Sequence, residues 1–114
     1  MRLKVPTLLA ALAATCAADT LKYWEEYWGF GHNLISVFYT STSSYFVKGE
    51  SGCRGTDVPG MTHFCVDWPR QRGHFRFHGQ NKRCMKQTFV SDWYACDDGH
   101  DCRVWVMEEA PCTW

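Results

Sequence analysis

The sequence predicts a small, mostly-β domain, a β-sandwich or barrel held together by disulfides, with one short N-terminal helix as an open alternative. Three observations favour this fold class. Segments rich in aromatic and β-branched residues recur at short intervals, turn residues separate them, and helical spacing of apolar residues is weak. Six cysteines beyond the first 18 residues supply covalent links to a chain whose core must be small.

The chain opens with features typical of a secretory signal peptide over residues 1–18. Two basic residues precede an apolar run over 8–14, and small residues follow it. The apolar run is shorter than the roughly 20 residues that span a bilayer. We therefore expect cleavage after Ala17 or Ala18 and a single secreted, extracellular domain over 19–114.

The first segment of that domain, TLKYWEEYW, is compatible with two structures. A helix would align Leu21, Trp24 and Trp28 on one side. A strand would place Leu21, Tyr23 and Glu25 on one face, which is a poorer apolar face. The segment stays open between helix and strand.

The next segments are predicted strands separated by turn residues. Asn33–Thr40 and Ser44–Lys48 are rich in aromatic and β-branched residues, with the polar run TSTSS between them. A loop is expected over Gly49–Gly60, where glycines, a proline and mixed charge gather around Cys53. Met61–Trp68 then alternates between apolar and polar residues, as a half-buried strand does.

Three further segments complete the predicted sheet. Gly73–His78 alternates more cleanly, and the turn HGQNK separates it from a strand over Arg83–Ser91. A polar loop with a cysteine at each end is expected over 96–102, followed by a last strand over Arg103–Met107. This number of short strands favours a small sandwich or barrel.

An even number of cysteines in a short secreted chain predicts three disulfides. The sequence alone does not select the pairing, although the close spacing of Cys53 and Cys65 makes that pair conceivable. The absence of any C-x-x-C pair argues against a metal site, and no metal or cofactor is expected. The predicted disulfide residues are Cys53, Cys65, Cys84, Cys96, Cys102 and Cys112.

The stretch RQRGHFRFHGQNKR is the most unusual part of the sequence. Alternation places Phe75 and Phe77 on one strand face and His74, Arg76 and His78 on the other. The simplest interpretation is that the phenylalanines enter the core and the cations face water. Because no acidic residue interrupts them, the cations also form a candidate binding surface. Its residues are Arg70, Arg72, His74, Arg76, His78, Lys82, Arg83 and Lys86.

Charge limits what this surface can do. Loss of the leader would leave 10 Lys and Arg against 12 Asp and Glu, a net charge of −2 with histidine neutral. Affinity for a polyanion such as a nucleic acid would therefore have to come from this local patch. Strand motifs that stack RNA bases expose their aromatic residues, whereas these phenylalanines form the only apolar side of their strand.

An enzymatic alternative is a secreted ribonuclease. Such a site needs a general base, a general acid and a cation for the phosphate. His74, Arg76 and His78, with Glu50 or His63 nearby in space, would supply these groups. Any strand with this alternation shows the same pattern, so binding is favoured over catalysis and no residue is assigned a catalytic role.

Two other groups of residues have a functional and a structural interpretation. Asp97, Asp98, His100 and Asp101 resemble cation ligands, but the spacing is not that of an EF-hand and a solvated hairpin loop is favoured.

The six tryptophans suggest sugar stacking, although large rings also fill the thin cores of small domains. A core position is favoured for Trp68 and Trp105, and the question stays open for Trp24, Trp28 and Trp114.

The run GCRGTDVPGMTHFCVDW, followed by RGHFRF and the spaced Cys84, Cys96, Cys102 and Cys112, resembles the small cysteine-rich secreted proteins of filamentous fungi, many of which are candidate effectors. The resemblance implies a secreted monomer that acts by binding a host or extracellular macromolecule, or an anionic surface. A membrane-active or antimicrobial toxin is a further alternative, which the near-neutral charge and the lack of a cationic amphipathic helix disfavour.

Overall fold

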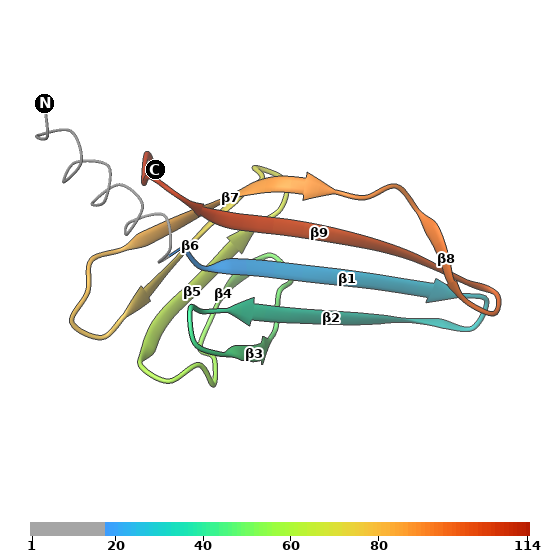
Figure 1. Ribbon diagram of the computed structural model, residues 1–114, viewed down its shortest axis with the longest axis horizontal. Coiled ribbons are helices and arrows are strands. Elements are labelled where there is room, and N and C mark those ends of the chain that lie inside the picture. Colours follow the sequence, from blue (N-terminus) through green and yellow to red (C-terminus); the bar gives the residue numbers. More distant parts are fainter. Residues whose placement is uncertain (1–17) are drawn as a thin grey trace, which may run out of the picture.

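The computed structural model describes residues 18–114, which form one antiparallel sheet of nine strands (Figure 1). The strand order is β3-β2-β1-β9-β7-β6-β5-β4, and β8 pairs with β9 beside this path. The predicted leader lies outside the described residues, apart from Ala18. The strands are β1 (Thr20–Trp28), β2 (Gly31–Tyr39), β3 (Ser44–Val47), β4 (Gly52–Arg54), β5 (Met61–Asp67), β6 (Arg72–Phe77), β7 (Arg83–Val90), β8 (Tyr94–Asp97) and β9 (His100–Ala110).

The mostly-β prediction is confirmed, and the two-sheet sandwich is replaced by a single sheet that curls as a half-barrel. The long strands β1, β2 and β9 extend well beyond the slanted strands β5 and β6, and β8 lies beside β9 at their far end (Figure 1). We call this far end the arm. No helix of the described chain is long and apolar enough to cross a membrane.

The first segment is a strand along its whole length, so the helical alternative is wrong for residues 20–28. β1 lies between β2 and β9, with Leu21 opposite Phe38 on one side and Met107 on the other. Both neighbours take up the backbone hydrogen bonds of β1. This pairing outweighs the helical spacing of Leu21, Trp24 and Trp28, because local propensity is weaker than tertiary context.

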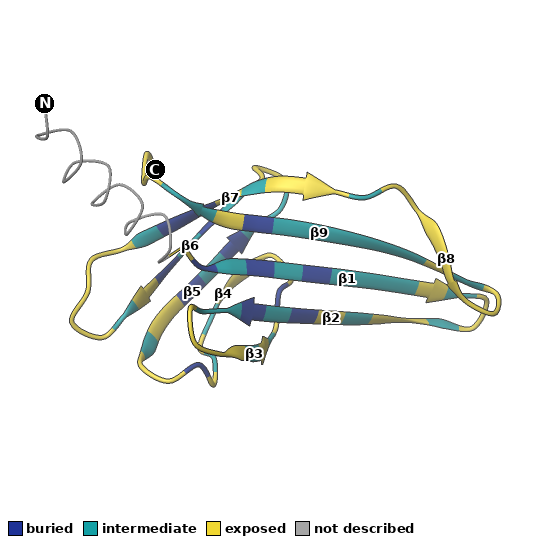
Figure 2. Ribbon diagram, viewed as in Figure 1, coloured by how far each residue is buried: buried dark blue, intermediate teal, exposed yellow. Residues whose placement is uncertain are grey.

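The core lies where the long strands face the inner side of the curled strands (Figure 2). Phe38 of β2 is fully buried and contacts two rings from the other side, Phe64 at 5.9 Å and Phe75 at 5.0 Å between centroids. Leu21, Met85 and Met107 are fully buried together with these rings. The arm, by contrast, is coloured mainly as intermediate and exposed in Figure 2, so its side chains have another role than filling this core.

Gly73 allows the inner strands to approach closely. A methyl group on its Cα would lie 2.7 Å from the main-chain oxygen of Cys65 and 2.9 Å from Cε of Met85. Both distances are too short for carbon contacts, so the absence of a side chain is required here.

The six predicted cysteines form three disulfides, as expected. Cys53–Cys65 joins β4 to β5, Cys84–Cys112 joins β7 to the segment after β9, and Cys96–Cys102 joins β8 to β9. The conceivable pair Cys53–Cys65 is among them. Each bond joins an edge or a terminal segment of the sheet to the rest, which is where a small β-domain has fewest packing contacts.

Candidate functional site

The alternation predicted in the basic stretch is realised in β6. Phe75 is fully buried, whereas Arg72, His74 and Arg76 lie on the outer face of the sheet. Lys86 lies opposite Arg72 in the register of β6 and β7 and therefore faces the same way. Lys82 extends along this side to the main-chain oxygen of Trp114. We call these five basic residues the basic face: Arg72, His74, Arg76, Lys82 and Lys86.

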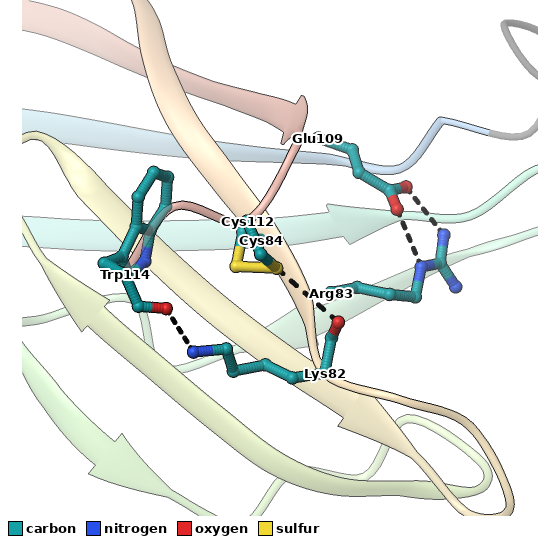
Figure 3. The surroundings of a disulfide bond; sticks show 6 residues. All are labelled: Lys82, Arg83, Cys84, Glu109, Cys112 and Trp114. Carbon is teal, nitrogen blue, oxygen red and sulfur yellow. Dashed lines mark hydrogen bonds and ion pairs between the residues drawn. A yellow bond between two sulfur atoms is a disulfide. The ribbon is translucent and has the colours of Figure 1, made fainter.

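Three other residues of the predicted surface lie elsewhere. Arg83 pairs with Phe75 across the strands, so its side chain points inward to Glu109 and to Asp19. Figure 3 shows Arg83 reaching Glu109 on one side of the Cys84–Cys112 disulfide and Lys82 reaching Trp114 on the other. The internal ion pair removes Arg83 from the candidate surface.

Arg70 and His78 lie beyond the two ends of β6. The guanidinium of Arg70 forms an exposed ion pair with Asp67 at 2.9 Å, which neutralises it locally. His78 follows the last residue of the strand, and its main-chain N–H donates to the oxygen of Gly60. The stretch that is continuous in sequence is therefore divided among an outer face, an inner ion pair and two turns.

The electrostatic neighbours of His74 are basic. Burial lowers the pKa of His74 below its ordinary value, and Lys82 and His63 lower it further. Burial and these positive neighbours therefore favour the uncharged form of His74. A hollow of 360 Å³ lies beside it and is lined in part by Arg72, Trp114 and the Cys53–Cys65 disulfide. The guanidinium of Arg72 lies over the Trp114 ring, 5.4 Å from its centroid.

Glu50, the carboxylate expected in a ribonuclease site, influences Tyr23 instead. The charge of Glu50 contributes to the raised pKa of Tyr23, a residue that points into the curled sheet. His63 does lie next to Arg76, as its cross-strand partner. His63 therefore adds a second histidine beside the basic face, whose cations are suited to holding an anion.

A second site, not identified from the sequence, lies on the inner side of the arm. It is a cleft of 450 Å³ lined by residues of β1, β9 and the segment before β8. We call it the aromatic cleft, and its residues are Glu25, Tyr27, Trp93, Asp101 and Arg103.

Cross-strand pairing brings the cleft residues together. Glu25 lies opposite Arg103 and Tyr27 opposite Asp101, so the four side chains share one face. The guanidinium of Arg103 lies 4.3 Å from the centroid of Trp93 and 4.6 Å from that of Trp105, which places the cation between two indoles.

Glu25 is the polar centre of this arrangement. One carboxylate oxygen accepts hydrogen bonds from Nε of Arg103 at 3.1 Å and from the indole N–H of Trp105 at 2.5 Å. The other accepts the hydroxyl of Tyr27 at 3.2 Å. Burial, together with the charge of Glu25 and this hydrogen bond, raises the pKa of Tyr27. The signal in the sequence was Glu25, which interrupts the apolar face that a strand would give Leu21 and Tyr23.

The suggested cation ligands are divided between the two sides of the arm. Asp101 belongs to the cleft, whereas Asp97 and His100 gather with Glu26 on the outer side. His100 Nδ1 lies 2.5 Å from Oε2 of Glu26, and its ring stacks on Trp28 with centroids 4.7 Å apart. A hydrogen bond and a stacked ring account for the position of His100, and we assign no metal to this group.

Comparison with known proteins gives no relative from which a role could be transferred. No protein-family model, curated protein or solved structure matches this chain. The basic face and the aromatic cleft are the two candidate sites of this protein.

Proposed function

We propose that the protein is a secreted, effector-type protein that acts by binding an anionic macromolecule of a host through its basic face. The supporting observation is the gathering of Arg72, Arg76 and Lys86 on one outward face of β6 and β7. Positive charges on the outer surface of a rigid sheet attract phosphates, sulfates or carboxylates of a large partner. Three disulfides favour an oxidising, extracellular setting for this activity.

Binding fits the basic face better than catalysis does. The side chains of Arg72 and Arg76 lie on an outer face of the sheet, on either side of His74. Enzymes surround a reacting phosphate with an acid, a base and a cation in a site that excludes water. An extended outer face instead presents several charges to a partner too large to enter a pocket.

Heparin is a suitable polyanionic probe for the basic face. We expect the variant Arg72→Glu/Arg76→Glu to elute from heparin at lower salt than the wild type, because two attractive charges become repulsive. The control Lys22→Glu/Lys48→Glu changes the net charge by the same amount on β1 and in the loop after β3. Equal elution of the two variants would show that net charge, and not the basic face, determines binding.

Incubation with total RNA separates this proposal from the ribonuclease alternative. We expect no cleavage by the purified domain over 19–114. Cleavage that disappears in His74→Ala would contradict a binding-only role and would assign the histidine to catalysis.

The host-directed part of the proposal has its own test. Infiltration of the purified domain into plant tissue should alter an immune or cell-death response, and Arg72→Glu/Arg76→Glu should reduce that response. Leakage of liposomes by the wild type would instead support the toxin alternative. An unchanged plant response to the double variant would separate the basic face from host activity.

A further inference from the structure

The aromatic cleft has the composition of a ligand site rather than of a core. Trp93 and Tyr27 remain 46% and 40% exposed although their rings contact one another at 5.6 Å. A side chain that merely filled the interior would be covered. Exposed rings beside an ordered carboxylate and guanidinium form a surface that is apolar in its faces and polar at its edges.

The polar groups of the cleft are held in fixed positions. Glu25 is engaged by Arg103, Trp105 and Tyr27, so its carboxylate cannot rotate freely. Arg103 is fixed in turn by the two indoles that cover it. Orienting these groups in advance reduces the entropy that a ligand would lose on binding.

The aromatic row continues from the cleft toward the core. Trp105 contacts Trp68 at 5.6 Å, and Trp68 stacks on Tyr23 at 5.4 Å. The indole N–H of Trp68 donates to the main-chain oxygen of Gly49 at 2.7 Å, which fixes that ring. The inner side of the arm therefore carries a rigid row of rings that ends in the exposed pair at the cleft.

We infer that the aromatic cleft binds a neutral pyranose unit of a polysaccharide, stacked on Trp93 and hydrogen-bonded by Asp101 and Arg103. The C–H face of a pyranose is apolar and flat enough to cover an indole, while its hydroxyls both donate and accept hydrogen bonds. Asp101 supplies an acceptor and Arg103 supplies donors at the rim of the same cleft. The inference does not depend on the basic face, which lies on other strands.

Charge distinguishes between classes of saccharide. The cleft contains two carboxylates, Glu25 and Asp101, against one guanidinium, Arg103. Its net negative charge would repel an acidic polysaccharide and leave a neutral one unaffected. The basic face is consequently suited to an acidic ligand and the cleft to a neutral one.

Adjacent aromatic residues provide a matched pair of variants. Trp93 lines the cleft, whereas Tyr94 pairs with Cys102 and so lies on the opposite face of the arm. The two side chains have almost the same exposure, 46% and 44%. Loss of either ring therefore removes a similar exposed aromatic surface, but only one of the two changes the cleft.

Binding of cellohexaose, chitohexaose and laminarihexaose, with polygalacturonate as the acidic comparison, can be followed by calorimetry on the folded domain. We expect saturable binding of at least one neutral hexaose. Trp93→Ala should weaken it about tenfold or more through lost stacking. Asp101→Asn, which keeps the shape of the side chain, should also weaken it, whereas Tyr94→Ala and Arg72→Glu/Arg76→Glu should bind as the wild type does.

Three results would overturn the inference: no binding of any neutral hexaose, stronger binding of polygalacturonate, or equal losses in Trp93→Ala and Tyr94→Ala. Far-ultraviolet circular dichroism of each variant shows whether a loss of binding reflects unfolding. A loss in Asp101→Asn with an unchanged spectrum supports the cleft even if Trp93→Ala fails to fold. Loss of heparin affinity in Arg72→Glu/Arg76→Glu without loss of hexaose binding shows that the two sites are separate.

Discussion

Replacement of Arg83 by methionine removes the cation of the inner ion pair while keeping an unbranched side chain over Phe75. In the wild type the guanidinium donates to both carboxylate oxygens of Glu109, at 2.8 and 2.6 Å, and to Asp19 at 3.1 Å. It also lies 4.9 Å from the centroid of the Phe75 ring. Arg83→Met would leave two neighbouring carboxylates without their shared cation.

The loss of stability expected for Arg83→Met depends on how deeply the ion pair is buried. Asp19 is 5% exposed, whereas the side chains of Arg83 and Glu109 are each 24% exposed. Breaking a fully buried pair costs about 3–5 kcal/mol because the remaining charge is uncompensated. Partial exposure reduces this, and we expect Arg83→Met to lower the free energy of unfolding by about 3 kcal/mol at neutral pH.

The two carboxyl groups respond to pH in opposite ways in the wild type. Burial works against the charged form of Glu109, but hydrogen bonds from Arg83 and from the N–H of Asp19 outweigh it and lower the pKa of Glu109. Burial of Asp19 outweighs its attraction to Arg83 and raises the pKa of that group. The contribution of Glu109 to stability is therefore present above its unfolded pKa and lost as the pH falls through the folded value, whereas protonation of Asp19 favours the folded state.

Without Arg83, both carboxyl groups would have raised pKa values in the folded state. The folded variant would then take up protons as the pH falls, and the cost of the substitution should shrink between pH 7 and about pH 3.5. Urea unfolding followed by tryptophan fluorescence at both pH values measures this difference.

Arg70→Met is the matched control, because Arg70 and Asp67 form an ion pair whose cation is 70% exposed. Its effect on unfolding should be too small to resolve at either pH. A cost of Arg83→Met that is the same at both pH values would refute the electrostatic reasoning and leave lost packing as the cause.

Three other features of the fold give separate predictions. Burial, followed by the charges of nearby glutamates, raises the pKa of Tyr23 to about 12. Absorbance titration should therefore show one phenol that ionises at higher pH than the others, and Tyr23→Phe should remove it. The contribution of Tyr23 to stability should be lost as the pH rises from 10 toward 12. Gly73→Ala should lower the free energy of unfolding by about 1–3 kcal/mol through steric overlap, whereas Gly55→Ala, with open space around its Cα, should have no comparable effect in the same urea titration. Cys84→Ser/Cys112→Ser removes a disulfide of sequence separation 28 and should lower the free energy of unfolding by about 3.6 kcal/mol through chain entropy. Cys96→Ser/Cys102→Ser removes the disulfide of separation 6 in the β8–β9 hairpin and should cost about 2.2 kcal/mol. Differential scanning calorimetry of the two double variants measures the difference.

Alternation and turn chemistry were sufficient to predict most strands, because a half-buried strand must show period two. β6 follows this rule closely, with Phe75 inward and His74 and Arg76 outward. The short strand β4 was hidden in the expected loop over Gly49–Gly60, since its three residues become a strand only by pairing with β5. Pairing between distant segments is not encoded in local pattern, and this is also why the disulfide connectivity stayed open.

Arg83 shows that basic residues close together in the sequence do not all lie on one surface. The six Lys and Arg residues of the predicted surface look alike in the sequence, yet Arg83 lies inside because its register partner is the buried Phe75. Its two acidic partners, Asp19 and Glu109, lie 64 and 26 residues away along the chain. No local signal connects residues so far apart, so only the register of the assembled sheet could separate the inner cation from the outer ones.

The open choice between helix and strand over residues 20–28 and the omission of the aromatic cleft have the same physical origin. The strand interpretation looked unfavourable because Glu25 would interrupt an apolar face shared with Leu21 and Tyr23. In the structure that face has two parts: Leu21 fills the core, and Glu25 orders Arg103 and Trp105 on the arm. A strand longer than the core that it crosses must present its remaining residues to something else. A polar residue that interrupts the apolar pattern of a strand therefore indicates a binding site on that face. Glu25 indicates such a site on the inner side of the arm.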